Sequence, residues 1–224
     1  MSSRMSFLIS AFCTWVLIAG CATVQPKIPV DQASVQPGTQ VTGRGAPLKL
    51  LGTPISVGKP LPSMGLVDAM TMKDVDLSKE RGSILLLSIV PSLDTRVCEE
   101  QTHILGEKGQ SLPGNVRRIV ISRDTPFAQK RFANESKLTQ LQYVSDYKQG
   151  DFGRSTGLLT EGTMLLARSV VVVNKQGIVR YIQVVPELSH LPDMDRAFQE
   201  AIMSSFVSSG VAKIMETLVF IPCL

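Results

Sequence analysis

The chain has 224 residues, of which 44% are hydrophobic, 19% charged and 5% aromatic, a composition typical of a globular protein with one sizeable core. Its formal net charge of +4 is too small, and its basic residues are too dispersed, to indicate a nucleic-acid partner. The four cysteines include no CxxC pair, which argues against a disulfide scaffold and a thioredoxin-type redox pair. With two histidines, a histidine-rich metal site is not expected.

The first twenty residues have the features of a secretion signal. An apolar run follows Arg4 and is shorter than the ~20 residues that a membrane-spanning helix needs. It ends in Ile18-Ala19-Gly20-Cys21, which resembles the lipobox of bacterial lipoproteins, where the cysteine thiol receives a diacylglyceryl group before cleavage. We therefore expect residues 1–20 to be a lipoprotein signal peptide and Cys21 to be lipidated. The alternatives are an uncleaved anchor and an ordinary signal with a chance cysteine.

Residues 21–40 are rich in Pro, Gln, Ser and Thr and show no sustained apolar period. Such a composition predicts a flexible tether that holds the following domain off a membrane. The lipobox implies a location in the bacterial cell envelope, anchored by lipid and facing the periplasm. Ala22, where an aspartate would signal retention in the inner membrane, favours the outer membrane.

From residue 41 the pattern alternates apolar strands with helices. Strand–helix–strand–helix, followed by a hairpin at Gly177 and a last helix, is a thioredoxin-like order, although periodicity alone establishes only an α/β sandwich. We expect a central mixed sheet flanked by helices, with an N-terminal β-hairpin, over residues 41–202, and a C-terminal extension over 203–224. The predicted strands are 48–51, 53–57, 84–90, 116–122, 168–173 and 178–184, and the predicted helices are 95–108, 126–135 and 193–202.

Cys98 is the strongest candidate for chemistry. It follows a buried strand and a short loop, and it lies in the first turn of a predicted helix that Asp94 or Thr95 can cap. The free N–H groups and partial positive charge of a helix N-terminus favour a thiolate, which is the nucleophilic form of cysteine. The alternative is a buried, inert cysteine.

The residues around Cys98 resemble a known family. The segment Pro91-Ser92-Leu93-Asp94-Thr95-Arg96-Val97-Cys98 carries the Pro-x-x-x-Thr-x-x-Cys motif of peroxiredoxins, and it is similar to the bacterial thiol peroxidases, the atypical two-cysteine group. The resemblance extends in order over about residues 42–202. The further matching segments are 57–58, 101–102, 126–132, 145–147 and 165–168.

The resemblance implies a peroxidase that reduces hydrogen peroxide and small organic hydroperoxides. Cys98 would be the peroxidatic thiolate, which becomes a sulfenic acid on reaction. The Thr95 hydroxyl would hydrogen-bond the thiolate and the peroxide, Pro91 would shield the thiolate from water, and Arg168 would stabilise the thiolate and the leaving oxygen. The resemblance implies no metal, flavin or nicotinamide, and it implies a homodimer.

The sequence departs from the family where the second cysteine is expected. In the family the resolving cysteine follows the Arg-Phe of the matching 126–132 segment, and here that position is Ala133. A one-cysteine cycle with an external thiol or thioredoxin-like reductant is therefore expected. Cys223 is an alternative resolving thiol, and weak or lost turnover is a third possibility. Arg96 also stands where the family usually has proline.

Two other function classes fit the sequence less well. A non-catalytic, membrane-tethered lipoprotein that keeps the fold as a binding scaffold is suggested by the missing resolving cysteine and by the unusual tail. A disulfide exchanger is disfavoured, because neither residue 95 nor residue 101 is a cysteine that could pair with Cys98.

Overall fold

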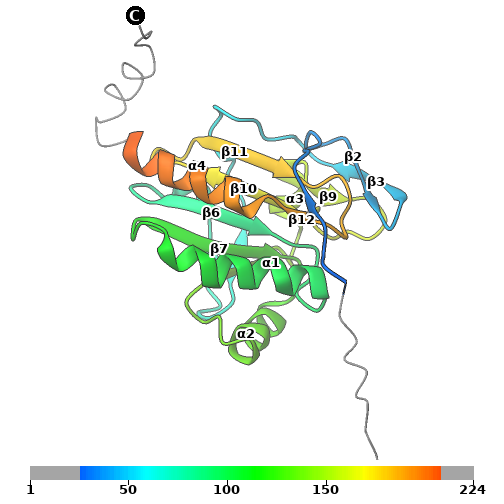
Figure 1. Cartoon of the computed structure of the whole chain (residues 1–224), viewed down its shortest axis with the longest axis horizontal. Coiled ribbons are helices and arrows are strands. Elements are labelled where there is room, and N and C mark those ends of the chain that lie inside the picture. Colours follow the sequence, from blue (N-terminus) through cyan, green and yellow to red (C-terminus); the bar gives the residue numbers. More distant parts are fainter. Residues whose placement is uncertain (1–25, 208–224) are drawn as a thin grey trace, which may run out of the picture.

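A mixed sheet of seven strands forms the centre of the molecule, in the order β11-β10-β6-β7-β8-β4-β5 (Figure 1). The computed structural model describes residues 26–207. Strands β6, β7 and β8 run parallel to one another, and the outer strands pair antiparallel. The strands are β4 (Leu66–Asp68), β5 (Asp74–Val75), β6 (Ile84–Ile89), β7 (Val116–Ser122), β8 (Gln142–Ser145), β10 (Ser169–Val173) and β11 (Val179–Val184).

The central strand β6 shows why the sheet has a core on both faces. All six of its residues are buried, as expected for a strand with layers on both sides. Because neighbouring side chains point to opposite faces, Leu85, Leu87 and Ile89 join one apolar cluster while Ile84 and Leu86 join the other. The continuous apolar run therefore serves two cores.

Three helices cover one face, and we call the apolar cluster beneath them the helical-face cluster. They are α1 (Arg96–Glu107), α2 (Pro126–Glu135) and α4 (Met194–Val207). Helices α1 and α4 lie side by side over the sheet, with α2 beyond α1 (Figure 1). The helical-face cluster holds Cys98 together with the inner residues of all three helices.

The opposite face is covered by a small three-stranded sheet, short helices and loops. The small sheet has the order β2-β3-β9, and the short helix α3 (Asp151–Thr156) buries Phe152 in the second cluster. The remaining elements are β2 (Gln40–Gly43), β3 (Ala46–Leu51), β9 (Leu159–Thr160), the strand pair β1 (Val30–Asp31) and β12 (Leu191–Pro192), and two 3₁₀ turns at Leu77–Lys79 and Lys108–Ser111. A central mixed sheet flanked by helices is the fold class that the sequence predicts.

The N-terminal segment 26–40 lies against the domain, so the prediction of a flexible tether is wrong for these residues. Strand β1 pairs with β12, and the buried amide of Gln183 donates to two carbonyl oxygens of the segment at 2.7 and 3.0 Å. The N–H of Val35 donates to the carbonyl of Val184 at 3.0 Å, along the outer edge of β11. Hydrogen bonds from the backbone and from the Gln183 side chain hold this polar segment, and its composition gave no sign of them.

The N-terminal hairpin is present but is shifted in the sequence. It consists of β2 and β3 joined by Arg44-Gly45, both with positive φ. Residues 53–57, predicted as its second strand, are irregular, because the free edge of β3 pairs with β9 instead. The second predicted hairpin is confirmed, with Gly177 at φ +79° between β10 and β11.

Two further differences concern the ends of the domain. Helix α4 runs to Val207, five residues beyond its predicted end, so the extension predicted from residue 203 begins inside a helix. Residues 1–25 and 208–224 lie outside the described part, and with them the predicted signal peptide and most of the tail. None of the helices between residues 26 and 207 is long and apolar enough to cross a membrane.

Candidate active site

Cys98 lies in the first turn of α1, directly after the loop that leaves β6. Thr95 is the N-cap residue, and the Cys98 N–H donates to the Thr95 carbonyl at 3.0 Å. The Cys98 side chain is 0% exposed and belongs to the helical-face cluster. A thiol in such surroundings needs a specific polar partner if it is to carry charge.

Arg168 provides that partner. It immediately precedes β10, whose first residue Ser169 pairs with Ile89 at the end of β6, so the register brings Arg168 to the start of α1. Its Nη2 donates to Cys98 Sγ at 3.2 Å. The other two donors, Nη1 and Nε, reach Gln101 Oε1 at 2.8 Å and the Leu188 carbonyl at 2.9 Å. The structure thus brings together two of the predicted site residues, Cys98 and Arg168.

Arg168 carries a buried positive charge that has no counter-ion among residues 26–207. The Arg168 side chain is buried, with 2% exposure, and no carboxylate between residues 26 and 207 forms an ion pair with it. A buried guanidinium without a counter-charge is costly. Of its three acceptors, an amide, a carbonyl and the Cys98 sulfur, only the sulfur can become negative. Cys98 Sγ is therefore the one acceptor of this guanidinium that could supply a counter-charge.

Thr95 and Pro91, the other two predicted site residues, make no hydrogen bond to the sulfur. The Thr95 side chain is exposed, and its Oγ1 donates to the Ser92 carbonyl at 3.0 Å instead of capping the helix or contacting Cys98. Pro91 is half-buried at the start of the loop. The expected bond from Thr95 to the thiolate is thus absent from this state, and forming it would require the hydroxyl to leave Ser92.

Asp124, a residue that the sequence analysis missed, accepts hydrogen bonds from the loop between β6 and α1. Its carboxylate accepts from Ser92 Oγ at 2.7 Å and from the Leu93 N–H at 2.8 Å, and also from Ser122 Oγ at 2.8 Å. Asp124 follows β7, the parallel neighbour of β6. An available signal was therefore its position at the carboxyl end of a strand beside β6, where polar groups of α/β proteins gather.

Ala133, at the position expected for a resolving cysteine, lies on α2 and is 0% exposed. It belongs to the same helical-face cluster as Cys98. Residues 26–207 contain no second cysteine beside Cys98. The lipidation candidate Cys21 and the alternative resolving residue Cys223 lie outside the described residues, so the structure leaves both predictions untested.

Arg96, the departure from proline, contacts the N-terminal segment. Its Nη2 donates to the Pro26 carbonyl at 2.6 Å. The chain therefore passes the start of α1 before it pairs with β12, as the blue segment in Figure 1 shows. The N-terminal segment thus contacts the side chain of Arg96, which precedes Cys98 by two residues on α1.

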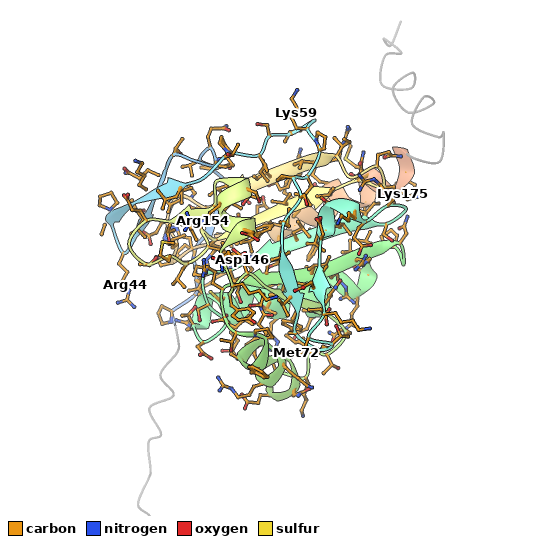
Figure 2. The ribbon with its side chains drawn as sticks, turned by 180° about the vertical axis from the view of Figure 1, so that it is seen from behind. Arg44, Lys59, Met72, Asp146, Arg154 and Lys175 are labelled. Atoms are coloured by element: carbon orange, nitrogen blue, oxygen red, sulfur yellow. The ribbon has the colours of Figure 1, made fainter. Side chains whose placement is uncertain are left out.

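A separate surface hollow of about 460 Å³ lies away from Cys98. It is lined by Ser63, Met64, Gly65, Asp151, Arg154 and Ser155. Arg154 belongs to α3, on the face opposite α1, and is labelled in the rear view (Figure 2). The hollow is open and has no contact with the Cys98 and Arg168 pair, so we do not assign it to the same chemistry.

Comparisons with known proteins agree on one family. The Redoxin family model matches residues 56–198. A thiol peroxidase of Halalkalibacterium halodurans is 37% identical over 161 residues, which cover 72% of this chain and 96% of that protein. A thiol peroxidase of Listeria innocua is 38% identical over 163 residues, which cover 73% of this chain and 98% of that protein.

Solved structures give the same result. A peroxiredoxin-like protein from Aquifex aeolicus superposes with a TM-score of 0.70 at 29% identity and covers 76% of this chain and 99% of its own. A thiol peroxidase from Chromobacterium violaceum, at 19% identity and a TM-score of 0.61, shares the fold over 77% of this chain and 97% of its own. These relatives are matched almost whole, whereas about a quarter of this chain has no counterpart in them.

Proposed function

The chain belongs to the thiol peroxidases of the redoxin family, and from this we propose that it reduces hydrogen peroxide and small organic hydroperoxides through Cys98, in a one-cysteine cycle. The observation that carries the assignment of Cys98 is its 3.2 Å contact with a buried Arg168 that has no carboxylate partner between residues 26 and 207. A peroxidase needs an ionised sulfur beside a fixed cation, because negative charge moves from sulfur to the leaving oxygen during attack.

The first step consumes the peroxide. The Cys98 thiolate attacks the terminal oxygen of ROOH, the O–O bond breaks, and the departing RO⁻ takes a proton to leave as ROH. The sulfur is oxidised to a sulfenic acid, and the peroxide is reduced. Arg168 already donates to the sulfur, so its guanidinium is in place to stabilise charge on the oxygen that is leaving.

The second step regenerates the thiol. Because residues 26–207 hold no second cysteine, we assign this step to an external thiol or a thioredoxin-like protein. The reductant's thiol condenses with the sulfenic acid, releases water and forms a mixed disulfide with Cys98. A second thiol of the reductant then releases Cys98 and leaves the reductant as a disulfide.

The test is to trap the sulfenic acid. The protein is treated with one equivalent of hydrogen peroxide in the presence of dimedone and examined by peptide mass spectrometry. We expect a dimedone adduct on Cys98 within seconds and none in Cys98→Ser. Folded protein that stays unlabelled, with a Cys98 thiol that remains reduced, contradicts the proposal and supports the non-catalytic scaffold.

A matched variant tests the one-cysteine assignment. Cys223→Ser should keep the same rate of labelling and the same dependence on added thiol as the unmodified chain. If peroxide instead produces a disulfide between Cys98 and Cys223, and the Cys223→Ser variant loses turnover, the cycle uses two cysteines and the one-cysteine assignment is wrong.

The proposal includes anchoring by lipid at Cys21, which would place the enzyme in the cell envelope facing the periplasm, at the outer membrane. Its support is the sequence Ile18-Ala19-Gly20-Cys21 after an apolar run. The intact mass of the mature chain should show acyl chains on residue 21, and Cys21→Ser should release the protein from the membrane fraction. A mature chain without acyl mass would contradict the anchor and leave the peroxidase assignment unaffected.

The proposal also includes a homodimer, which rests on the resemblance to thiol peroxidases. Analytical ultracentrifugation of the mature domain checks it directly. A single species with the mass of one chain at micromolar concentration would contradict it.

A further inference from the structure

The first described residues of the chain, 26–31, bridge the two regions that carry Cys98 and Arg168, and we call them the strap. At one end of the strap, the Pro26 carbonyl accepts from Arg96 Nη2 at 2.6 Å. Arg96 is the first residue of α1 and precedes Cys98 by two residues. The other end of the strap forms β1 beside β12, as the blue segment in Figure 1 shows.

Between β11 and β12 lies the turn that receives Arg168. The His190 N–H donates to the Glu187 carbonyl at 2.9 Å and closes this turn. Within it, the Leu188 carbonyl accepts from Arg168 Nε at 2.9 Å. Because the guanidinium is rigid and planar, a displacement of the Leu188 carbonyl would also redirect the nitrogen that donates to Cys98 Sγ.

The strap fixes the end of this turn that leads into β12. His190 Nδ1 lies 3.1 Å from Asp31 Oδ2, and both side chains are partly buried. The Leu191 N–H donates to the Pro29 carbonyl at 2.8 Å. One short piece of chain is therefore bonded to α1 by its first residue and to the turn by its last three.

The strap is also stiff. Proline stands at residues 26 and 29, and each ring fixes its own φ and disfavours the helical conformation in the residue before it. Three residues of chain separate the two carbonyls that accept from Arg96 and Leu191, so their Cα atoms can be at most about 11 Å apart. A bridge of this kind limits how far the turn and the start of α1 can move apart.

We infer that Arg96 and Asp31 are positioning residues, which bind the two ends of the strap and so keep Cys98 aligned with the turn that aims Arg168. The inference rests on the proposed role of Cys98 as the nucleophile. It accounts for an arginine where the family usually has proline, because a proline side chain has no donor for the Pro26 carbonyl. The strap lies outside residues 56–198, which match the family model, so it is an addition to the matched domain.

Substitutions at the two ends of the strap test this role in the full chain. The measurement is the rate of alkylation of the Cys98 peptide by iodoacetamide from pH 4 to pH 10, which follows the fraction of thiolate. We expect Arg96→Pro to raise the midpoint of this profile and to slow alkylation at pH 7 by about fivefold, as for one lost hydrogen bond. Proline is well tolerated at the first position of a helix, so this variant should fold.

Asp31→Ala should have an effect of the same size and direction, although it leaves α1 unchanged. Arg96→Lys keeps a donor for the Pro26 carbonyl, so its profile should stay close to that of the wild type. Arg131→Ala is the matched control, because Arg131 is another exposed arginine near the start of α1 but binds Asp94, at 3.4 Å, instead of the strap. Its alkylation midpoint should stay in place.

The double variant separates the strap from the charge of Arg96. If both residues act through the strap, Arg96→Pro combined with Asp31→Ala should slow alkylation by about fivefold, and not by the product of about 25-fold that independent effects give. The product would show that Arg96 acts on the sulfur directly, which contradicts the inference.

Two other outcomes would also overturn it. An unchanged alkylation profile in either single variant, with a lower thermal midpoint, would show that the strap only stabilises the fold. A shift in Arg131→Ala as large as that in Arg96→Pro would show that the loss of any nearby cation is sufficient. Alkylation requires no turnover, so a failure to reduce peroxide would count against the proposed function alone.

Discussion

Two positions in the helical-face cluster, Cys98 on α1 and Ala133 on α2, are both 0% exposed. They differ in their polar neighbours. Cys98 Sγ accepts a hydrogen bond from Arg168, whereas the Ala133 side chain contributes only a methyl group to the cluster, and its backbone carbonyl is occupied by the Leu138 N–H at 3.0 Å. Burial alone makes a cysteine unreactive, and a fixed cation reverses that outcome.

The comparison also indicates how the chemistry is divided. At Cys98 the cation is in place, and two neutral acceptors orient it. At the position where the family resolves the sulfenic acid there is a small side chain in a closely packed core. The following predictions test this contrast, beginning with the largest effect.

Removing the cation should abolish most of the reactivity of Cys98. We expect Arg168→Met, which preserves volume and removes charge, to lower the second-order rate constant for hydrogen peroxide by roughly 100- to 1000-fold. Stopped-flow measurement with one equivalent of peroxide gives this constant. Arg168→Lys keeps the charge but cannot reach Cys98, Gln101 and Leu188 together, so an intermediate value is expected. A loss of only a few-fold in Arg168→Met would mean that Arg168 is not the electrostatic partner.

Restoring a thiol at position 133 should change the fate of the sulfenic acid. We expect Ala133→Cys to form an intramolecular disulfide with Cys98 after peroxide treatment, which non-reducing peptide mapping detects. The added sulfur overfills a packed site, so a loss of about 1–3 kcal/mol in the free energy of unfolding should accompany it. Ala133→Ser, of similar size and without a thiol, is the control. A dimedone adduct of unchanged lifetime in Ala133→Cys would show that α2 cannot bring position 133 to Cys98.

Glu187 should contribute stability that depends on pH. Partial burial raises the pKa of its carboxyl, but hydrogen bonds from the Gly45 N–H, Ser189 and Thr42 outweigh this and lower the pKa to about 2. With a folded value below the usual 4.5, this stability is present above about pH 4.5 and is lost as the pH falls towards 2. We expect Glu187→Gln to lower the free energy of unfolding at pH 7 by about 1–3 kcal/mol, with a smaller difference from wild type at pH 3.

The control for Glu187 is Asp76, which lies far from the Cys98 site. Burial raises the pKa of Asp76, but hydrogen bonds from Ser63, Ser78 and the Met64 N–H outweigh it and lower the pKa to about 2. Asp76→Asn should reduce stability with the same pH dependence and leave the peroxide rate unchanged. Glu187→Gln should in addition slow the peroxide reaction, because the neighbouring Leu188 carbonyl holds Arg168. Equal peroxide rates in both variants would show that the loop at 187 does not support the site.

The smallest expected effect concerns Thr95. Its hydroxyl bonds the Ser92 carbonyl in this state, so it can contribute to catalysis only after it turns to the peroxide. We expect Thr95→Val to slow the peroxide reaction by about tenfold, as for the loss of one hydrogen bond in the transition state, with Thr95→Ser close to wild type. An equal slowing of iodoacetamide alkylation would show that Thr95 acts on the thiolate and not on the peroxide.

The sequence was informative where a local pattern determines the structure. The apolar run before Cys98 predicted the buried strand β6, and the sequence Asn174 to Gly177 predicted the turn of a hairpin. Both signals are local, because an apolar run and a glycine suited to a positive φ can be recognised from neighbouring residues alone. The pair formed by Cys98 and Arg168 was reached through the resemblance, since they are 70 residues apart and only the register of β10 on β6 joins them.

The sequence was uninformative where long-range hydrogen bonds decide the structure. The segment 26–40 is polar and without period, and hydrogen bonds to distant parts of the chain, among them β11, β12 and Arg96, give it a conformation. Asp124 and Gln101 are common residue types whose roles depend on which groups the fold places opposite their oxygens. No local pattern carries that information.

The position of the N-terminal segment has a practical consequence for handling the domain. A shortened protein that starts at residue 41 would lose Ser34 and Val35, which bond the backbone of Val184 at the end of β11. It would also deprive the Gln183 amide of both its acceptors. A bared strand edge is a template for self-association, so such a protein should precipitate or form mixed oligomers that are easily mistaken for native assembly.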